Sequence, residues 1–151
     1  MNEKLKNISE IKLSYHPKFK MSERPQITCS QDAKEILLQH FDHDTFALHE
    51  SFKVLYLSRS NRVLGIEHHS IGSTTGCIVD KSRILSAAIL SNASSIILCH
   101  NHPSGNPRPS ESDLKITRDI KEACKLIDKV LFDHIILTED GYTSFADEAL
   151  L

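Results

Sequence analysis

The stretch 99–113, Cys-His-Asn-His-Pro-Ser-Gly-Asn-Pro-Arg-Pro-Ser-Glu-Ser-Asp, constrains the fold more than any other part of the chain. It follows the short apolar run 96–98, which is typical of a buried central strand, although the pattern alone also fits a helix. Side chains two residues apart on a strand share a face, so we expect His100 and His102 to point together and Asn101 to point away. The three prolines and the glycine that follow predict an irregular loop.

A helix is expected behind this loop, over residues 110–129, with Ser110 as its N-cap. Ile116 and Ile120 follow Asp113 at helical spacing, which places the carboxylate on the apolar face, one turn from the helix start. Two imidazoles and one carboxylate would then converge where a strand ends and a helix begins. This set of donors suits a catalytic zinc ion that keeps a fourth position for water.

Each of these residues also has an ordinary structural explanation. Asp113 could complete a capping box with Ser110, and His100 and His102 could be polar residues at a strand end. Their joint occurrence favours a metal site, because the prolines between them would hold the ligands in place before an ion arrives.

The spacing His100-x-His102, seven residues, Ser110, two residues, Asp113 resembles that of the JAB/MPN (JAMM) metalloprotease family. The string His-Asn-His-Pro-Ser-Gly, with Pro-Ser ahead of the helix, resembles the RadC branch in particular, and the likeness extends from about Glu50 to the C-terminus. The resemblance implies Zn²⁺ held by the two histidines and Asp113, with Ser110 helping to stabilise an oxyanion. It also implies a three-layer fold like that of cytidine deaminases.

The same family uses an upstream glutamate as general base, just before a strand. Glu50 matches this position, at the start of the strand expected over 50–57, and the resemblance makes it the preferred base. Glu67, inside a second expected strand over 63–71, is the competing candidate. The structural alternative for Glu50 is an ordinary solvated carboxylate at a strand start.

The remaining pattern predicts an α/β protein with a mixed sheet flanked by helices. Further helices are expected over 31–41, capped by Ser30, and over 83–92, capped by Asp80 or Ser82; a strand over 132–138 is expected to return through a tight turn over 142–145.

Three parts of the chain have roles that the sequence leaves open. His134 could support the metal site or be a core histidine, and the glycine-rich segment 72–76 could line a substrate groove or form a plain turn. Residues 1–29 are expected to form an N-terminal arm in which 11–15 alternates like a strand, and residues 30–151 to form one RadC-type JAB/MPN domain.

The composition limits the classes of function. A net charge of −2 without a dense basic run does not indicate a DNA-binding face, although a local basic patch would still allow nucleic-acid binding. The four cysteines contain no Cys-x-x-Cys pair and no apolar stretch is long enough to cross a membrane, so a cytoplasmic protein is expected.

We therefore expect a zinc metallopeptidase that cleaves a peptide or isopeptide bond in a peptide or protein substrate. The alternative is a DNA-repair-associated, nucleic-acid-binding module; longer RadC-like proteins carry a helix-hairpin-helix segment, for which the segment before Glu50 is short. The sequence leaves the oligomeric state open.

Overall fold

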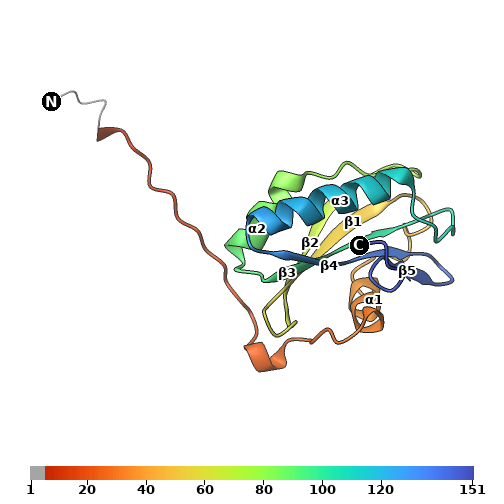
Figure 1. The fold of residues 1–151 in the computed structure, drawn as a ribbon, viewed down its shortest axis with the longest axis horizontal. Coiled ribbons are helices and arrows are strands. Elements are labelled where there is room, and N and C mark those ends of the chain that lie inside the picture. The colour runs from red at the N-terminus through yellow and green to blue at the C-terminus, as the bar shows by residue number, and fades with distance from the viewer. Residues whose placement is uncertain (1–5) are drawn as a thin grey trace.

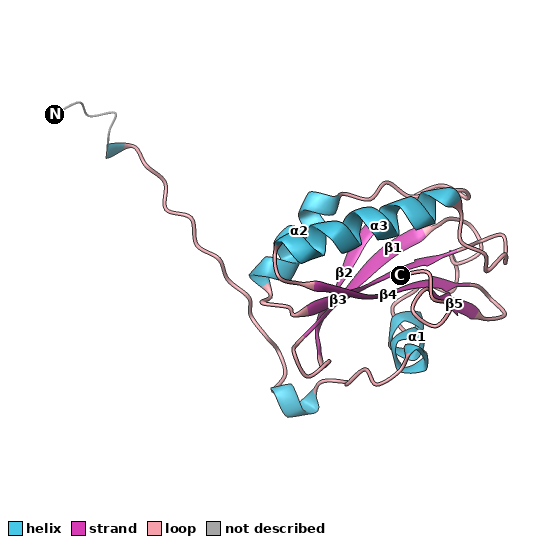
Figure 2. Ribbon diagram, in the orientation of Figure 1, coloured by secondary structure: helices cyan, strands magenta, loops and turns pink. Residues whose placement is uncertain are grey.

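The computed structural model describes residues 6–151, in which a five-stranded mixed sheet lies between helices (Figure 1 and Figure 2). The strands are β1 Ser51–Leu57, β2 Val63–Ile71, β3 Ser95–Asn101, β4 Val130–Leu137 and β5 Tyr142–Ser144. The helices are α1 Ser30–Leu38, α2 Lys81–Leu90, α3 Glu111–Leu126 and a short 3₁₀ helix, Met21–Glu23. The strand order is β2-β1-β3-β4-β5; β3 and β4 run parallel, and the other neighbouring pairs are antiparallel.

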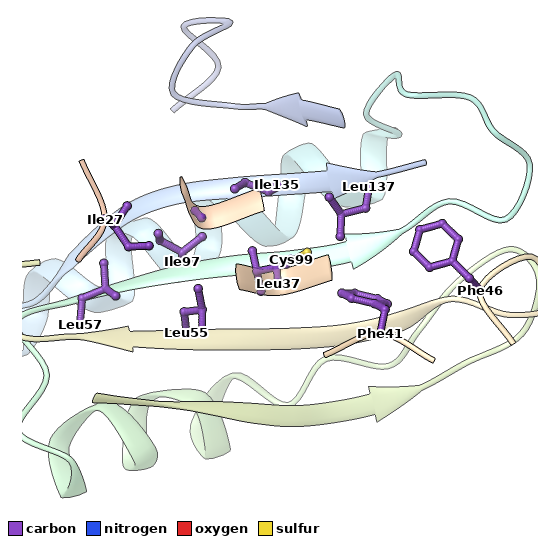
Figure 3. Packing of buried hydrophobic residues seen from close by; sticks show 11 residues of the cluster. Ile27, Leu37, Phe41, Phe46, Leu55, Leu57, Ile97, Cys99, Ile135 and Leu137 are labelled. Carbon is purple, nitrogen blue, oxygen red and sulfur yellow. The ribbon is translucent and has the colours of Figure 1, made fainter. Parts of the chain in front are cut away.

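Strand β3 lies at the centre of the sheet and is buried along its whole length, as its continuous apolar run predicts. Because side chains alternate along a strand, Ile97 and Cys99 face α1, whereas Ile96 and Leu98 face α2 and α3. Figure 3 shows the core on the α1 side, to which α1, β1, β3 and β4 all contribute.

The second core fills the opposite face of the sheet, beneath α2 and α3. It includes Val54 of β1, Ile84 of α2 and Ile120 of α3, all fully buried. Helices therefore cover both faces of the sheet (Figure 2), and the predicted three-layer α/β arrangement is confirmed.

The helix starts agree with the sequence prediction in two cases of three. Asp80 caps α2 by accepting a hydrogen bond from the backbone N–H of Arg83, and Ser110 caps α3. The predicted cap of α1 is wrong by one residue: Cys29 is the N-cap and Ser30 is already helical. The Asp32 carboxylate accepts the Cys29 N–H and so satisfies the free end of this helix without Ser30.

The predicted strand over 11–15 is not formed. In Figure 1 residues 6–13 extend away from the sheet, and Ile11 and Leu13 are exposed. A lone strand has no partner for its backbone hydrogen bonds, so alternation in the sequence was not sufficient. The predicted arm also includes residues 1–5, which lie outside the described residues. No helix within residues 6–151 has the length and apolar character needed to cross a bilayer.

Candidate metal centre

Three potential metal ligands meet at the C-terminal end of β3. His100 lies on this strand, His102 follows its last residue, and Asp113 is the third residue of α3. The Nε2 atom of His100 lies 3.0 Å from Nε2 of His102 and 3.1 Å from Oδ1 of Asp113, and the Nε2 of His102 lies 3.5 Å from Oδ2 of Asp113. The structure thus brings together the three residues predicted as ligands.

This donor set fits a zinc ion. Ligand atoms of a tetrahedral zinc site, each about 2.0–2.2 Å from the ion, stand roughly 3.3–3.6 Å apart. The separations of 3.0–3.5 Å between the three donor atoms are close to that spacing. Two imidazoles and one carboxylate also leave one tetrahedral position open, which is the arrangement of catalytic rather than structural zinc sites.

Local contacts favour the metal-binding form of two of these residues, His102 and Asp113. The Nδ1 of His102 donates to the backbone carbonyl of Asn106 at 2.7 Å, since a carbonyl can only accept, and the neutral ring therefore has its lone pair on Nε2. Burial alone would raise the pKa of Asp113, but the two adjacent imidazoles and the Ser110 hydroxyl hold this pKa well below its usual range. Asp113 is therefore an anion over the whole physiological range.

Glu50 lies in the same cleft as two members of this triad, His100 and Asp113. The cleft has a volume of about 360 Å³, and its walls include Glu50, His100, Ser110 and Asp113. Burial raises the pKa of Glu50, and the two nearby imidazoles counteract part of that shift. A half-buried carboxylate beside a metal position has the surroundings of a general base.

The segment 72–76 fixes the backbone of Glu50. The Glu50 N–H donates to the Ser73 carbonyl at 2.8 Å, and the Gly72 N–H donates to the Glu50 carbonyl at 2.8 Å. A side chain at Gly72 would meet the Gly76 carbonyl oxygen, because an added Cβ would lie 1.9 Å from it. Thr75 and Gly76 line the cleft, so of the two interpretations the groove wall fits this segment.

Glu67, the competing base, is engaged elsewhere. Its carboxylate lies 2.7 Å from the Arg83 guanidinium and 2.9 Å from His69 Nδ1, and it accepts the Tyr56 hydroxyl. These partners use both carboxylate oxygens at a point on β2 that is not part of the cleft walls. The contacts of Glu67 therefore suit a structural role.

Ser110 has two contacts that belong to its capping role. Its hydroxyl accepts the Asp113 N–H at 3.2 Å and donates to Asp113 Oδ2 at 2.7 Å. The same hydroxyl lies at the cleft wall. Capping box and cleft position are thus combined in one residue, and rotation about the Cβ–Oγ bond is enough to redirect its hydrogen.

Cys77 is the thiol in the cleft wall, and it does not suit a nucleophile. Burial raises the pKa of Cys77 to about 11, so the thiol is protonated near neutral pH.

Three residues around the ligands were not assigned a role by the sequence analysis or were left open. The buried side chain of Asn101 accepts the Ser51 N–H at 2.7 Å and donates to the carbonyls of Phe46 and His49, which holds the segment leading to Glu50. A polar residue between two ligands on a buried strand was the available signal.

His134, left open between two roles, contacts His100, and Thr117 contacts His134. Thr117 stands one turn after Asp113 on the inward helix face, which was the signal for it.

The sequence of the chain is similar to those of one known protein family. The family model described as RadC-like JAB domain matches residues 27–150. A UPF0758 protein of Flavobacterium johnsoniae is 40% identical over 83% of the chain and 53% of its own length. Those of Aquifex aeolicus and Coxiella burnetii are 41% and 36% identical over 85% and 98% of the chain, and over 54% and 64% of their own lengths. The chain therefore spans less than two thirds of these relatives.

Proposed function

The chain belongs to the RadC-like JAB domain family, and we propose on this basis that it is a zinc-dependent hydrolase of peptide or isopeptide bonds. The observation that carries the proposal is the convergence of His100, His102 and Asp113 at the edge of a cleft that His100 and Asp113 line together with the half-buried carboxylate of Glu50. A glutamate base beside a metal ion with an open coordination position is the smallest set of groups that metal-assisted acyl transfer needs.

The ligand triad would hold the zinc ion through two Nε2 atoms and the Asp113 carboxylate. When bound, zinc supplies Lewis acidity, which lowers the pKa of water from 15.7 toward about 7 and polarises a carbonyl. Glu50 accepts the proton of the attacking water and returns it to the leaving amine, so that the same carboxylate acts as base and then as acid. The Ser110 hydroxyl turns from Asp113 toward the carbonyl oxygen and donates to it as negative charge develops.

The metal part of the proposal is tested by metal analysis and by removal of a ligand. We expect about one zinc ion per purified chain, and none in His102→Ala at comparable thermal stability. Wild-type protein treated with a chelator should not cleave fluorogenic linear or isopeptide-linked test peptides, and added zinc should restore cleavage. Cleavage that survives complete removal of the metal would overturn the proposal.

The role of the base is tested by a matched pair of variants. Glu50→Gln should reduce cleavage roughly 10²–10⁴-fold with unchanged zinc affinity, because it removes a proton acceptor but no ligand. Glu67→Gln should retain most of the activity, since Glu67 faces Arg83 and His69 rather than the cleft. Intact hydrolysis in Glu50→Gln would exclude Glu50 as the base.

A further inference from the structure

A continuous series of hydrogen bonds links the start of α3 to the far nitrogen of the ligand His100. The Thr117 hydroxyl lies 2.6 Å from the Asp113 carbonyl oxygen and 2.7 Å from Nδ1 of His134. The Nε2 of His134 in turn lies 2.9 Å from Nδ1 of His100. These four groups come from α3, β4 and β3, and the two rings are almost completely shielded from water.

The position of each hydrogen in this series follows from the first contact. A carbonyl oxygen can only accept, so the single hydroxyl hydrogen of Thr117 is used on the Asp113 carbonyl. The Thr117 oxygen can then only accept from His134, and Nδ1 of His134 must carry a hydrogen. With the opposite arrangement, two oxygen acceptors would face each other at 2.6 Å with no hydrogen between them.

The neutral form of His134 extends this order to the ligand. His134 is fully buried, and its ring centroid lies 4.6 Å from that of Phe145 and 5.9 Å from that of Phe52. An imidazolium there would lose its hydration. A neutral ring with its hydrogen on Nδ1 has a lone pair on Nε2. The contact at 2.9 Å therefore requires a hydrogen on Nδ1 of His100.

We propose that Thr117 and His134 are positioning residues that keep His100 in the tautomer whose Nε2 lone pair faces the metal position. A ligand histidine in proteins usually donates its second N–H to a carboxylate, carbonyl or water, and that partner sets its tautomer. Here a second histidine is the partner, and a histidine can donate as well as accept. The Thr117 hydroxyl removes this ambiguity, because it fixes the hydrogen of His134 on the side away from His100.

This inference rests on the proposed role of His100 as a zinc ligand, and its test separates the two. Thr117→Val keeps the shape of the side chain but removes the hydroxyl, whereas Thr117→Ser keeps the hydroxyl and serves as the matched control. The ring ¹⁵N shifts of metal-free protein at mildly alkaline pH report the tautomer of His134 directly. We expect the hydrogen on Nδ1 in wild type and in Thr117→Ser, and on Nε2 in Thr117→Val.

Zinc affinity, measured by competition with a chelator, gives the second readout. Thr117→Val should bind zinc about 10–100-fold more weakly, because His134 then donates to His100 and drives the hydrogen of His100 onto Nε2. Thr117→Ser should bind within about threefold of wild type, and the circular dichroism spectra of both variants should match that of the wild type.

Three results would overturn the inference: a hydrogen on Nε2 of His134 in the wild type, an unchanged His134 tautomer in Thr117→Val, or equal zinc affinity in both variants. The first of these needs no variant and stands even if Thr117→Val does not fold. If the protein proves not to be a hydrolase, the nitrogen shifts and the zinc titration still decide the matter, since neither depends on cleavage.

Discussion

Replacement of Asn101 by alanine should destabilise the protein far more than replacement of an exposed asparagine. The Asn101 side chain is fully buried and satisfies the Ser51 N–H and the carbonyls of Phe46 and His49. Alanine leaves these backbone groups without a partner. A buried polar group that loses its hydrogen bond costs about 1–3 kcal/mol. Two of these three backbone groups belong to buried residues and the third to a partly buried one. The free energy of unfolding should therefore fall by about 3 kcal/mol or more.

The assay is urea unfolding followed by circular dichroism, with a chelator present so that zinc binding does not contribute to stability. A loss of about 3 kcal/mol corresponds to a fall in Tm of roughly 6–12 °C for a domain of this size. Asn106→Ala is the matched control: its exposed side chain accepts one hydrogen bond, from the Arg108 N–H at 3.1 Å, and the change should cost less than about 1 kcal/mol. Equal losses in the two variants would refute the idea that Asn101 holds the segment before Glu50.

Three further outcomes are expected. Alkylation under native conditions should label the exposed Cys29 and spare the buried Cys99, as mass spectrometry of the digested protein would show; rapid labelling of both would contradict the described core. Gly72→Ala should lower both stability and the proposed peptide cleavage but leave zinc affinity within a few fold, because the new methyl group collides with the Gly76 carbonyl in the segment that holds Glu50 and not with a proposed ligand. Desolvation lowers the pKa of Lys53, so the unfolded chain binds more protons just below the ordinary lysine pKa. The free energy of unfolding should therefore rise with pH in that range, and Lys53→Met should remove the rise.

The parts of the site that come from local patterns were predictable from sequence. The apolar run before His100 indicated a buried strand, and the apolar residues after Asp113 indicated which helix face it occupies. Even there, sequence signals can conflict. Ser30 and Asp32 both satisfy the rules for a helix start, but the Asp32 carboxylate accepts the Cys29 N–H, and the helix begins one residue earlier than a Ser30 cap predicts.

The contacts behind the ligands depend on the pairing of distant strands, and sequence patterns do not fix that pairing. His134 reaches His100 because β3 and β4 are parallel with a register in which Leu98, not His100, lies opposite His134. A shift of one residue would turn the His134 ring to the α1 face. The same holds for Asn101, since Phe46 and His49, two of its three partners, belong to the segment before β1 and the third, Ser51, begins β1.

The central position of β3 has a consequence for control of the protein. Strand β3 directs His100 to one face of the sheet and Asn101 to the other, and these two residues position both a potential metal ligand and the segment that ends at Glu50. Within residues 6–151, both parts of the site therefore depend on the same strand. A partner or ligand that displaced β3 would therefore disturb both parts of the site at once, whereas one that bound at the mouth of the cleft would leave both in place.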